Sequence, residues 1–213
     1  MDRLPGWELT PVSALRLVMA SANPDKVAEI KALIAAMMPG TVVVARPASL
    51  GEVDEDADTL IGNARLKAWA VMQASGEAAI SDDTGLEVAA LGGEPGVYAA
   101  RYAGHDATYA DNVAKLRNEL DRVGATLPEQ RGAVFRTVAM VVFPDGRELH
   151  AEGHVDGWIA HTPSGSTGFG YDPVFIPHEG DGRTFADLGP ETKQRLSHRG
   201  RAFRALFEAL SAG

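Results

Sequence analysis

Cysteine is absent from this 213-residue sequence, which excludes disulfide bonds and metal sites built on thiolates. A bound metal would therefore have oxygen or imidazole ligands. Long apolar runs are absent as well, because none approaches the roughly 20 residues that a membrane-spanning helix needs. Residues 1–12 lack the basic-then-apolar order of a secretory signal. We therefore expect a cytoplasmic protein with no membrane partner.

Positive charge is also scarce, since 20 Lys and Arg stand against 29 Asp and Glu and the formal net charge at pH 7 is −9. This balance is unfavourable for binding a nucleic acid polymer. A small phosphate substrate is still compatible with it, provided that a metal and a few local cations neutralise the phosphates. Hydrophobic residues make up 45% of the chain, which is typical of a globular protein with one large domain or two small lobes.

Strand and helix signals alternate along the first half of the chain. Asn23 is the expected N-cap of the first helix, and Pro24 its first residue. Short apolar or β-branched runs predict strands at residues 15–20, 41–45 and 78–81. Helical spacing of apolar residues predicts helices at residues 24–38 and 108–123, and an alanine-rich stretch predicts one at 59–74.

The second half predicts a hairpin, a short strand and a closing helix. Strands at residues 133–143 and 147–160 flank a Pro-Asp-Gly turn, and a brief strand follows at 174–176. A helix is expected at residues 197–210, with Ser197 as its N-cap. Alternating elements followed by a hairpin predict an α/β fold with α+β character, in which helices flank a mixed sheet. The cleft between the two halves is the expected site.

The strand-to-helix turn from Ser21 to Lys26 is the first candidate for substrate binding. Free backbone N–H groups at a helix start attract anions, and Lys26 adds a full positive charge one turn into the helix. An ordinary capped helix with a surface lysine fits the same residues, so this segment by itself leaves both interpretations open.

Carboxylates form the second candidate. Asp82 and Asp83 directly follow a predicted strand, where paired carboxylates can bind a hard cation or act as a general base. Because neighbouring side chains on an extended chain point to opposite faces, we expect one to face the cleft and the other to support it or make a second metal contact. The acidic loop around Glu55 could lend a further carboxylate. Solvated acidic turns are the alternative for both segments.

Two later segments carry groups suited to a nucleobase. A glycine-rich loop offers Phe169 as a stacking face and Asp172 as an acceptor for ring N–H groups. Lys193, His198 and Arg199 lie at or near the start of the last helix and offer donors to phosphate or carbonyl oxygens. A loop with a core aromatic and a helix with exposed cations are the alternatives. Together the candidates supply the parts of a metal-assisted phosphoryl reaction.

These segments resemble, in order, the motifs of the inosine/xanthosine triphosphate pyrophosphatases, often called the Ham1 family. An ordered set of motifs is far more specific than any one of them, and the resemblance extends over nearly the whole chain. The matching stretches are Ser21–Lys26, Asn63–Ala68, Ser81–Leu86, Leu91–Tyr98, Ala100–Gly104, Gly168–Pro173 and Ser197–Gly200.

The resemblance implies an elongated mixed sheet with two lobes and a central cleft. Residues 15–213 would form this single domain, and residues 1–14 would be an N-terminal extension without a family counterpart. The resemblance also implies a homodimer that depends on Mg²⁺ and cleaves nucleoside triphosphates between the α- and β-phosphates, releasing pyrophosphate. The expected substrates are the damaged purine nucleotides ITP, dITP and XTP.

Motif positions assign a role to each candidate residue. Asp83 is expected to be the general base and a metal contact, Glu55 a further metal contact, and Asp82 a supporting carboxylate or second metal contact. The residues expected at the triphosphate are Ser21, Asn23, Lys26, Thr84 and Lys193. The residues expected around the nucleobase are Phe169, Gly170, Tyr171, Asp172, His198 and Arg199.

Three positions depart from the family pattern. Ala22 stands where the family usually has Gly, which bears on the shape of the phosphate turn. Gly62 replaces a common Glu, so one acidic contact is missing there. Thr84 replaces the commoner Ser and keeps its hydroxyl.

Other functions stay open from the sequence. One is a related pyrophosphatase for other modified or pyrimidine nucleotides, and another is a non-catalytic nucleotide-binding sensor. The pair Asp82 and Asp83 argues against a sensor, because two carboxylates repel a bare triphosphate unless a metal is present. A glycosidase with paired carboxylates fits poorly, because adjacent aspartates on an extended chain point apart.

Overall fold

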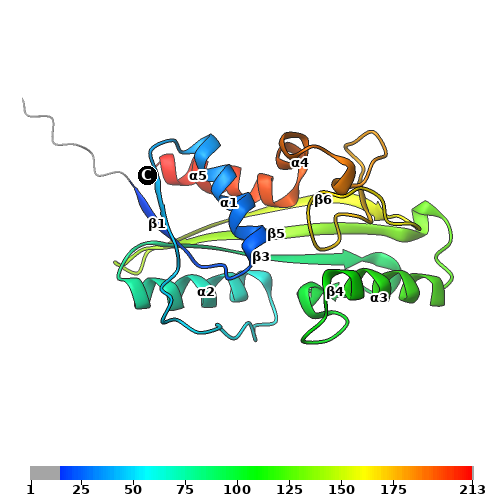
Figure 1. Cartoon of the computed structure of the whole chain (residues 1–213), viewed down its shortest axis with the longest axis horizontal. Coiled ribbons are helices and arrows are strands. Elements are labelled where there is room, and N and C mark those ends of the chain that lie inside the picture. The colour runs from blue at the N-terminus through cyan, green and yellow to red at the C-terminus, as the bar shows by residue number, and fades with distance from the viewer. Residues whose placement is uncertain (1–14, 213) are drawn as a thin grey trace, which may run out of the picture.

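One mixed β-sheet forms the middle layer of the protein (Figure 1). The computed structural model describes residues 15–212, so the expected N-terminal extension, residues 1–14, lies outside the described residues. Across the sheet the strands are β2 (Val42–Val44), β1 (Arg16–Met19), β3 (Ala79–Val88), β5 (Gly132–Val142), β6 (Glu148–Ile159) and β7 (Phe175–Pro177), and β4 (Pro95–Gly96) pairs with β3.

Helices cover both faces of this sheet. One face carries α1 (Pro24–Met37), α4 (Pro190–Leu196) and α5 (His198–Ser211), and the other carries α2 (Leu60–Ser75) and α3 (Tyr109–Arg122) (Figure 1). Strands β2, β1 and β3 pair in parallel, whereas β3, β5, β6 and β7 pair antiparallel. The predicted α/β fold with a mixed sheet is therefore confirmed. Within the described residues, none of the helices has the length and apolar character needed to cross a membrane.

Local signals place the helices that shape the site. Asn23 caps α1 by accepting hydrogen bonds from the backbone N–H groups of Asp25 (2.9 Å) and Lys26 (3.2 Å), and Pro24 opens the helix as predicted. Ser197 caps α5 by accepting from the N–H of Gly200 at 3.0 Å. Both helix starts are thus determined by residues within one turn.

Strand β3 is longer than the sequence suggested. Asp82 and Asp83 do not end a strand but lie in its middle, opposite Ala139 and Val138 of β5. Pairing with the long strand β5 outweighs the turn preference of the Asp-Asp-Thr-Gly segment, and both carboxylates are buried. Gly85 serves close packing rather than a turn, because a Cβ there would lie 2.8 Å from the carbonyl oxygen of Gly96 in β4.

The hairpin of β5 and β6 is confirmed, with pairing that runs from Gly132 opposite Trp158 to Val142 opposite Glu148. Helix α4 was not predicted, because it has only seven residues and follows Gly189 without a side-chain cap. The division of the chain into two lobes stays a prediction.

Helix α5 lies so close to β6 that the contact tolerates only glycine. A methyl group on Gly153 would overlap the carbonyl oxygen of His198 and the backbone nitrogen of Ala202. This close approach positions the first turn of α5, which carries His198 and Arg199.

We expect Gly153→Ala to lower the free energy of unfolding by about 1–3 kcal/mol, because the helix must move away from the strand. Urea unfolding measures the change. Gly132→Ala is the matched control on β5, since a Cβ there meets nothing within 4 Å. Equal stability of the two variants would show that α5 does not pack this tightly.

Candidate active site

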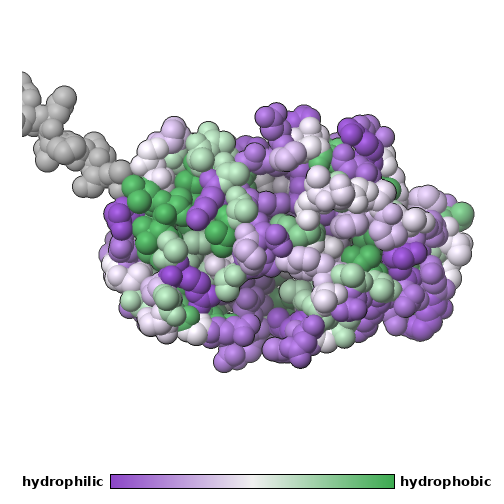
Figure 2. Space-filling model, in the orientation of Figure 1, coloured by the Kyte–Doolittle hydropathy of each residue, from purple (hydrophilic) through white to green (hydrophobic). Residues whose placement is uncertain are grey.

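A cavity of about 250 Å³ opens where β3, the starts of α1, α3 and α5 and the loop before β7 come together. On the face drawn in Figure 2, hydrophilic residues surround a recess near the middle of the molecule. Most of the residues singled out in the sequence line this cavity. They are Ser21, Asn23, Lys26, Glu55, Asp83, Thr84, Phe169, Gly170, Tyr171, Asp172, His198 and Arg199.

The turn before α1 forms one wall. The Ser21 hydroxyl accepts a hydrogen bond from the backbone N–H of Asn23 at 3.2 Å, which tightens the turn. Lys26 points inward, with its Nζ 3.6 Å from a carboxylate oxygen of Asp82 and only 17% of its side chain exposed. Burial lowers the pKa of Lys26, and Asp82 opposes that shift. The surface-lysine interpretation of this segment is therefore wrong.

Asp83 and Glu55 form a second wall of the cavity. Both carboxylates accept hydrogen bonds from the ammonium group of Lys67, at 2.9 Å for Asp83 Oδ1 and 2.8 Å for Glu55 Oε2. Asn63 adds a 3.3 Å hydrogen bond to the other oxygen of Asp83. Burial would lower the pKa of Lys67, but the two carboxylates outweigh it and raise that pKa.

Lys67 belongs to a motif that was recognised, but no role was predicted for it. It lies four residues after Asn63 on α2, and both side chains are buried on a helix face that otherwise buries mainly alanine and valine. Two polar residues on a buried apolar helix face are the signal that could have identified them.

The donor chemistry of Asp83 and Glu55 fits a magnesium ion. Mg²⁺ prefers oxygen ligands and is usually bound through one or two carboxylates together with substrate phosphates. Lys67 already places one positive charge between the two carboxylates. Among the described residues no three His, Cys, Asp or Glu side chains gather as a metal cluster, so a fully protein-built cage is not present there.

Asp82 lies on the other side of β3, as alternation along a strand requires. Its Oδ2 accepts from Nε and Nη2 of Arg199, both at 3.1 Å, and the carboxylate is fully buried. Burial alone would raise the pKa of Asp82, but Lys26 and Arg199 hold it well below its usual range. The structure thus separates Asp82 from Asp83 and Glu55, as expected for neighbouring side chains on a strand, and a role of Asp82 at a metal stays a prediction.

The loop before β7 forms the aromatic wall. The carboxylate of Asp172 closes this loop by accepting from the backbone N–H of Phe169 (2.8 Å) and from Lys193 Nζ (2.6 Å). Both of these hydrogen bonds use Oδ2, and the expected role of Asp172 as an acceptor for ring N–H groups stays a prediction. Tyr171 donates to the carbonyl of Ala99 at 2.9 Å and is buried, so it supports the wall from behind.

Two cations flank the ring of Phe169. Lys193 Nζ lies 5.1 Å and the Arg199 guanidinium 5.4 Å from the ring centroid. Lys193 does not line the cavity itself. It borders a neighbouring cavity of about 290 Å³ that shares Phe169 and Arg199 with the first.

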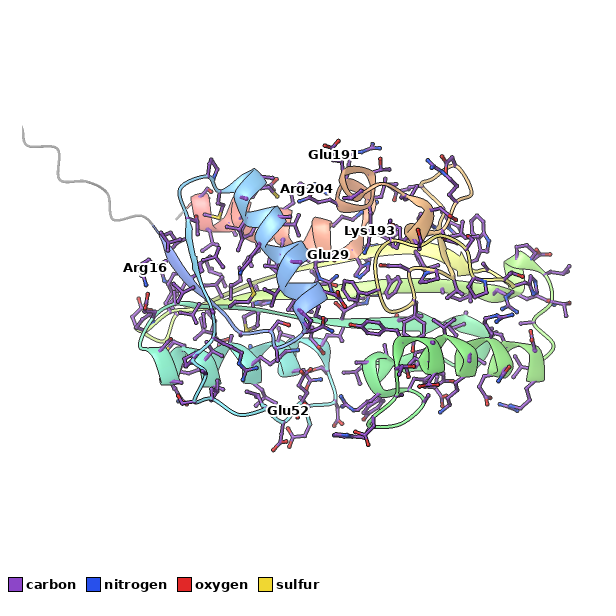
Figure 3. The ribbon with its side chains drawn as sticks, viewed as in Figure 1. Arg16, Glu29, Glu52, Glu191, Lys193 and Arg204 are labelled. Atoms are coloured by element: carbon purple, nitrogen blue, oxygen red, sulfur yellow. The ribbon has the colours of Figure 1, made fainter. Side chains whose placement is uncertain are left out.

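Glu29 forms ion pairs with both Lys193 and Arg199, and it was not predicted from the sequence. It accepts a hydrogen bond from Lys193 Nζ, and both residues are labelled in Figure 3. It also accepts one from Arg199 Nη1 at 2.6 Å. Burial would raise the pKa of Glu29, but the two cations outweigh it and lower that pKa. Glu29 lies three residues after Lys26 on α1, and this spacing on one helix face is the signal that could have identified it.

His198 packs flat against Phe135, with ring centroids 4.3 Å apart and an interplanar angle of 10°. Within the described residues its Nδ1 has no hydrogen-bond partner. Burial, and then the charges of Arg199 and Lys193, lower the pKa of His198 well below 6.5. The imidazole is therefore neutral at pH 7 and does not contribute a positive charge to the site.

Comparison with known proteins gives consistent matches over nearly the whole chain. A family model described as the Ham1 family matches residues 17–209. A dITP/XTP pyrophosphatase of Thermus thermophilus is 44% identical over 199 residues, which cover 93% of each chain. A HAM1 protein from Coxiella burnetii has a TM-score of 0.82 at 34% identity and covers 93% of this chain and 100% of its own. The Staphylococcus aureus Ham1 protein has a TM-score of 0.79 at 37% identity, covering 92% and 98%.

The buried neutral imidazole makes stability depend on pH. The folded-state pKa of His198 lies well below the unfolded-state value of about 6.5. The contribution of the neutral imidazole to the free energy of unfolding is therefore fully present above about pH 6.5, and it is lost as the pH falls from there through the folded-state pKa. We expect the free energy of unfolding to fall by up to about 1.4 kcal/mol per pH unit in this window. Urea unfolding at several pH values measures it.

His198→Phe is the control, because it keeps a ring against Phe135 but cannot take up a proton. We expect a flatter pH dependence for this variant below pH 6.5 than for the wild-type protein. Parallel curves for the two proteins would contradict the assignment to His198.

Proposed function

This chain belongs to the Ham1 family, as its motifs indicated, and we propose that it hydrolyses the damaged purine nucleotides ITP, dITP and XTP to the monophosphate and pyrophosphate. It is thus a nucleoside-triphosphate pyrophosphatase, a hydrolase that cleaves the α,β-anhydride. Removing such triphosphates cleanses the nucleotide pool. Relatives named dITP/XTP pyrophosphatases, which match more than nine-tenths of the chain, support the reaction class.

The main support from the structure is a juxtaposition. Lys26 at the start of α1, the carboxylate of Asp83 and the ring of Phe169 line the same cavity. An anion site, a candidate base and a stacking surface therefore lie within reach of one nucleotide. A binding site without catalysis needs no such carboxylate beside a phosphate turn.

The triphosphate would bind at the turn before α1. The positive end of the helix dipole attracts its phosphates, and Ser21 and Asn23 keep the turn in shape through the hydrogen bonds described above. The Lys26 ammonium offsets negative charge that develops on the departing pyrophosphate. Ala22 in place of the usual glycine changes this turn little, since Asn23 still caps the helix.

Hydrolysis would be carried out at the wall formed by Asp83 and Glu55. Mg²⁺ held by Asp83 and Glu55 would polarise phosphate oxygens and neutralise part of their charge. Asp83 would accept the proton of the water that attacks the α-phosphorus. Lys67 donates to both carboxylates and so orients them toward the cavity.

Base selectivity would depend on Arg199. The 6-keto oxygen of hypoxanthine or xanthine accepts hydrogen bonds from a guanidinium or from backbone N–H groups, whereas the amino group of adenine leaves these donors unpaired. Glu29, Asp82 and the hydroxyl of Thr84 fix the direction of the guanidinium, with Thr84 Oγ1 3.2 Å from Nη2.

The chain acts on a small-molecule substrate, and we propose further that it works as a cytoplasmic homodimer. The homodimer is carried over from the family resemblance, and the cytoplasmic location from the sequence, in which neither a secretory signal nor a long apolar run was found. The proposed location and oligomeric state do not affect the proposed reaction. Sedimentation of the purified protein measures the oligomeric state.

Product analysis on a panel of ITP, XTP, dITP, ATP and dCTP, with and without Mg²⁺, tests the proposed function. We expect pyrophosphate and monophosphate from the first three nucleotides, at least about 10²-fold faster than from ATP, and only when Mg²⁺ is present. Equal rates on ATP and ITP would overturn the selectivity. Nucleotide binding without any product would identify a non-catalytic sensor. Hydrolysis of ATP or dCTP but not of ITP, dITP or XTP would identify a different pyrophosphatase.

Asp83→Asn keeps the shape of the side chain but cannot accept the proton, so we expect turnover of ITP to fall by about 10²-fold or more. Steady-state kinetics at saturating ITP and Mg²⁺ measure the loss. Asp106→Asn is the matched control, because that side chain is fully exposed and lies outside the cavity. Near-normal turnover of the Asp83 variant would reject it as the base.

A further inference from the structure

Tyr109, the first residue of α3, lies at the cavity in a position that its own helix fixes. Thr108 and Asp111 form a capping box at this helix start, with the Thr108 hydroxyl donating to Asp111 Oδ2 at 2.6 Å. The buried Asn112 ties the same turn to the preceding loop, accepting from Ala103 N–H at 2.8 Å and donating to the Ala100 carbonyl at 3.0 Å. The backbone that carries Tyr109 is therefore held on both sides.

The Tyr109 hydroxyl contacts the start of α1, which is 84 to 86 residues away in the chain. It accepts a hydrogen bond from the Asn23 side-chain amide at 2.8 Å and donates to Asp25 Oδ2 at 3.1 Å. The oxygen of the same Asn23 amide caps α1. The nitrogen and the oxygen of the Asn23 amide are thus both hydrogen-bonded, so Tyr109 and α1 together determine the orientation of this side chain.

The Tyr109 ring packs against the aromatic wall. Its centroid lies 5.8 Å from that of Phe169, with an interplanar angle of 38°. Tyr109 is 41% exposed although it lines the cavity. A nucleoside that entered the cavity would cover part of this apolar ring, which favours binding.

We propose that Tyr109 is a positioning residue for the nucleotide, which fixes the phosphate turn through its hydroxyl and the base-stacking wall through its ring. This inference rests on the proposed function and goes beyond it, because it assigns a role to a side chain outside the family motifs recognised in this sequence. Tyr109 thereby sets the distance between the phosphate turn, which would bind the triphosphate, and the aromatic wall, which would bind the base.

The Tyr109 hydroxyl also fixes the direction of the Asp25 carboxylate. Asp25 is an acidic residue one position after the start of α1, close to where the triphosphate would bind, and its carboxylate would repel phosphates. The hydrogen bond from Tyr109 turns this carboxylate toward α3. Partial burial raises the pKa of the Tyr109 hydroxyl, so it keeps its proton and remains a donor through the neutral pH range.

Two substitutions separate the parts of this role. Tyr109→Phe removes both hydrogen bonds but keeps the ring, and we expect the KM for ITP to rise about 3- to 10-fold with kcat within about 2-fold of wild type. Tyr109→Ala also removes the ring, and we expect KM to rise about 10- to 100-fold. A purely structural contact would lower thermal stability without this graded change in KM.

Tyr102→Phe is the matched control, because its hydroxyl donates to Glu94 at 3.2 Å and it does not line the cavity. We expect its kinetics to equal those of the wild type. The inference is overturned if the wild-type protein hydrolyses ITP and both Tyr109 variants keep its KM, or if only thermal stability changes. Absence of hydrolysis by the wild-type protein would instead overturn the proposed function itself.

Discussion

The buried ion pair between Asp82 and Arg199 is the interaction on which the arrangement of the site depends. A carboxylate in the middle of a sheet is costly to desolvate unless charges of opposite sign neutralise it. Arg199 from α5 supplies two hydrogen bonds, and Lys26 from α1 lies 3.6 Å away. Because these cations come from different helices, pairing with one carboxylate holds the starts of α1 and α5 against β3.

The same principle explains how an acidic chain can offer a site for phosphates. The protein has a formal net charge of −9, yet Lys26, Lys67, Lys193 and Arg199 gather within and behind one cavity. Each of them contacts at least one carboxylate, so their charges are compensated locally and their side chains are held in fixed directions. Buried, oriented cations suit a small metal-bound phosphate group better than a broad basic surface would.

Local signals in the sequence were enough for most elements and for most of the site. Asn23 and Ser197 cap α1 and α5 through contacts within three residues, so neither helix start needs information from elsewhere in the chain. The two failures have different causes. The ten-residue length of β3 comes from its pairing with β5, and the seven-residue α4 has too few residues to show a helical period.

The sequence by itself determined the family, most of the elements and many of the residues that line the cavity, because motifs, caps and periodicity depend on a few neighbouring positions. Only the tertiary structure decided which charges meet. Alternation along β3 sends Asp82 toward Arg199 and Asp83 toward Lys67. Tyr109 and Glu29 find partners 84 to 170 residues away. Such pairs depend on how the sheet brings helices together in space, and a local pattern can mark one member of a pair but not its distant partner.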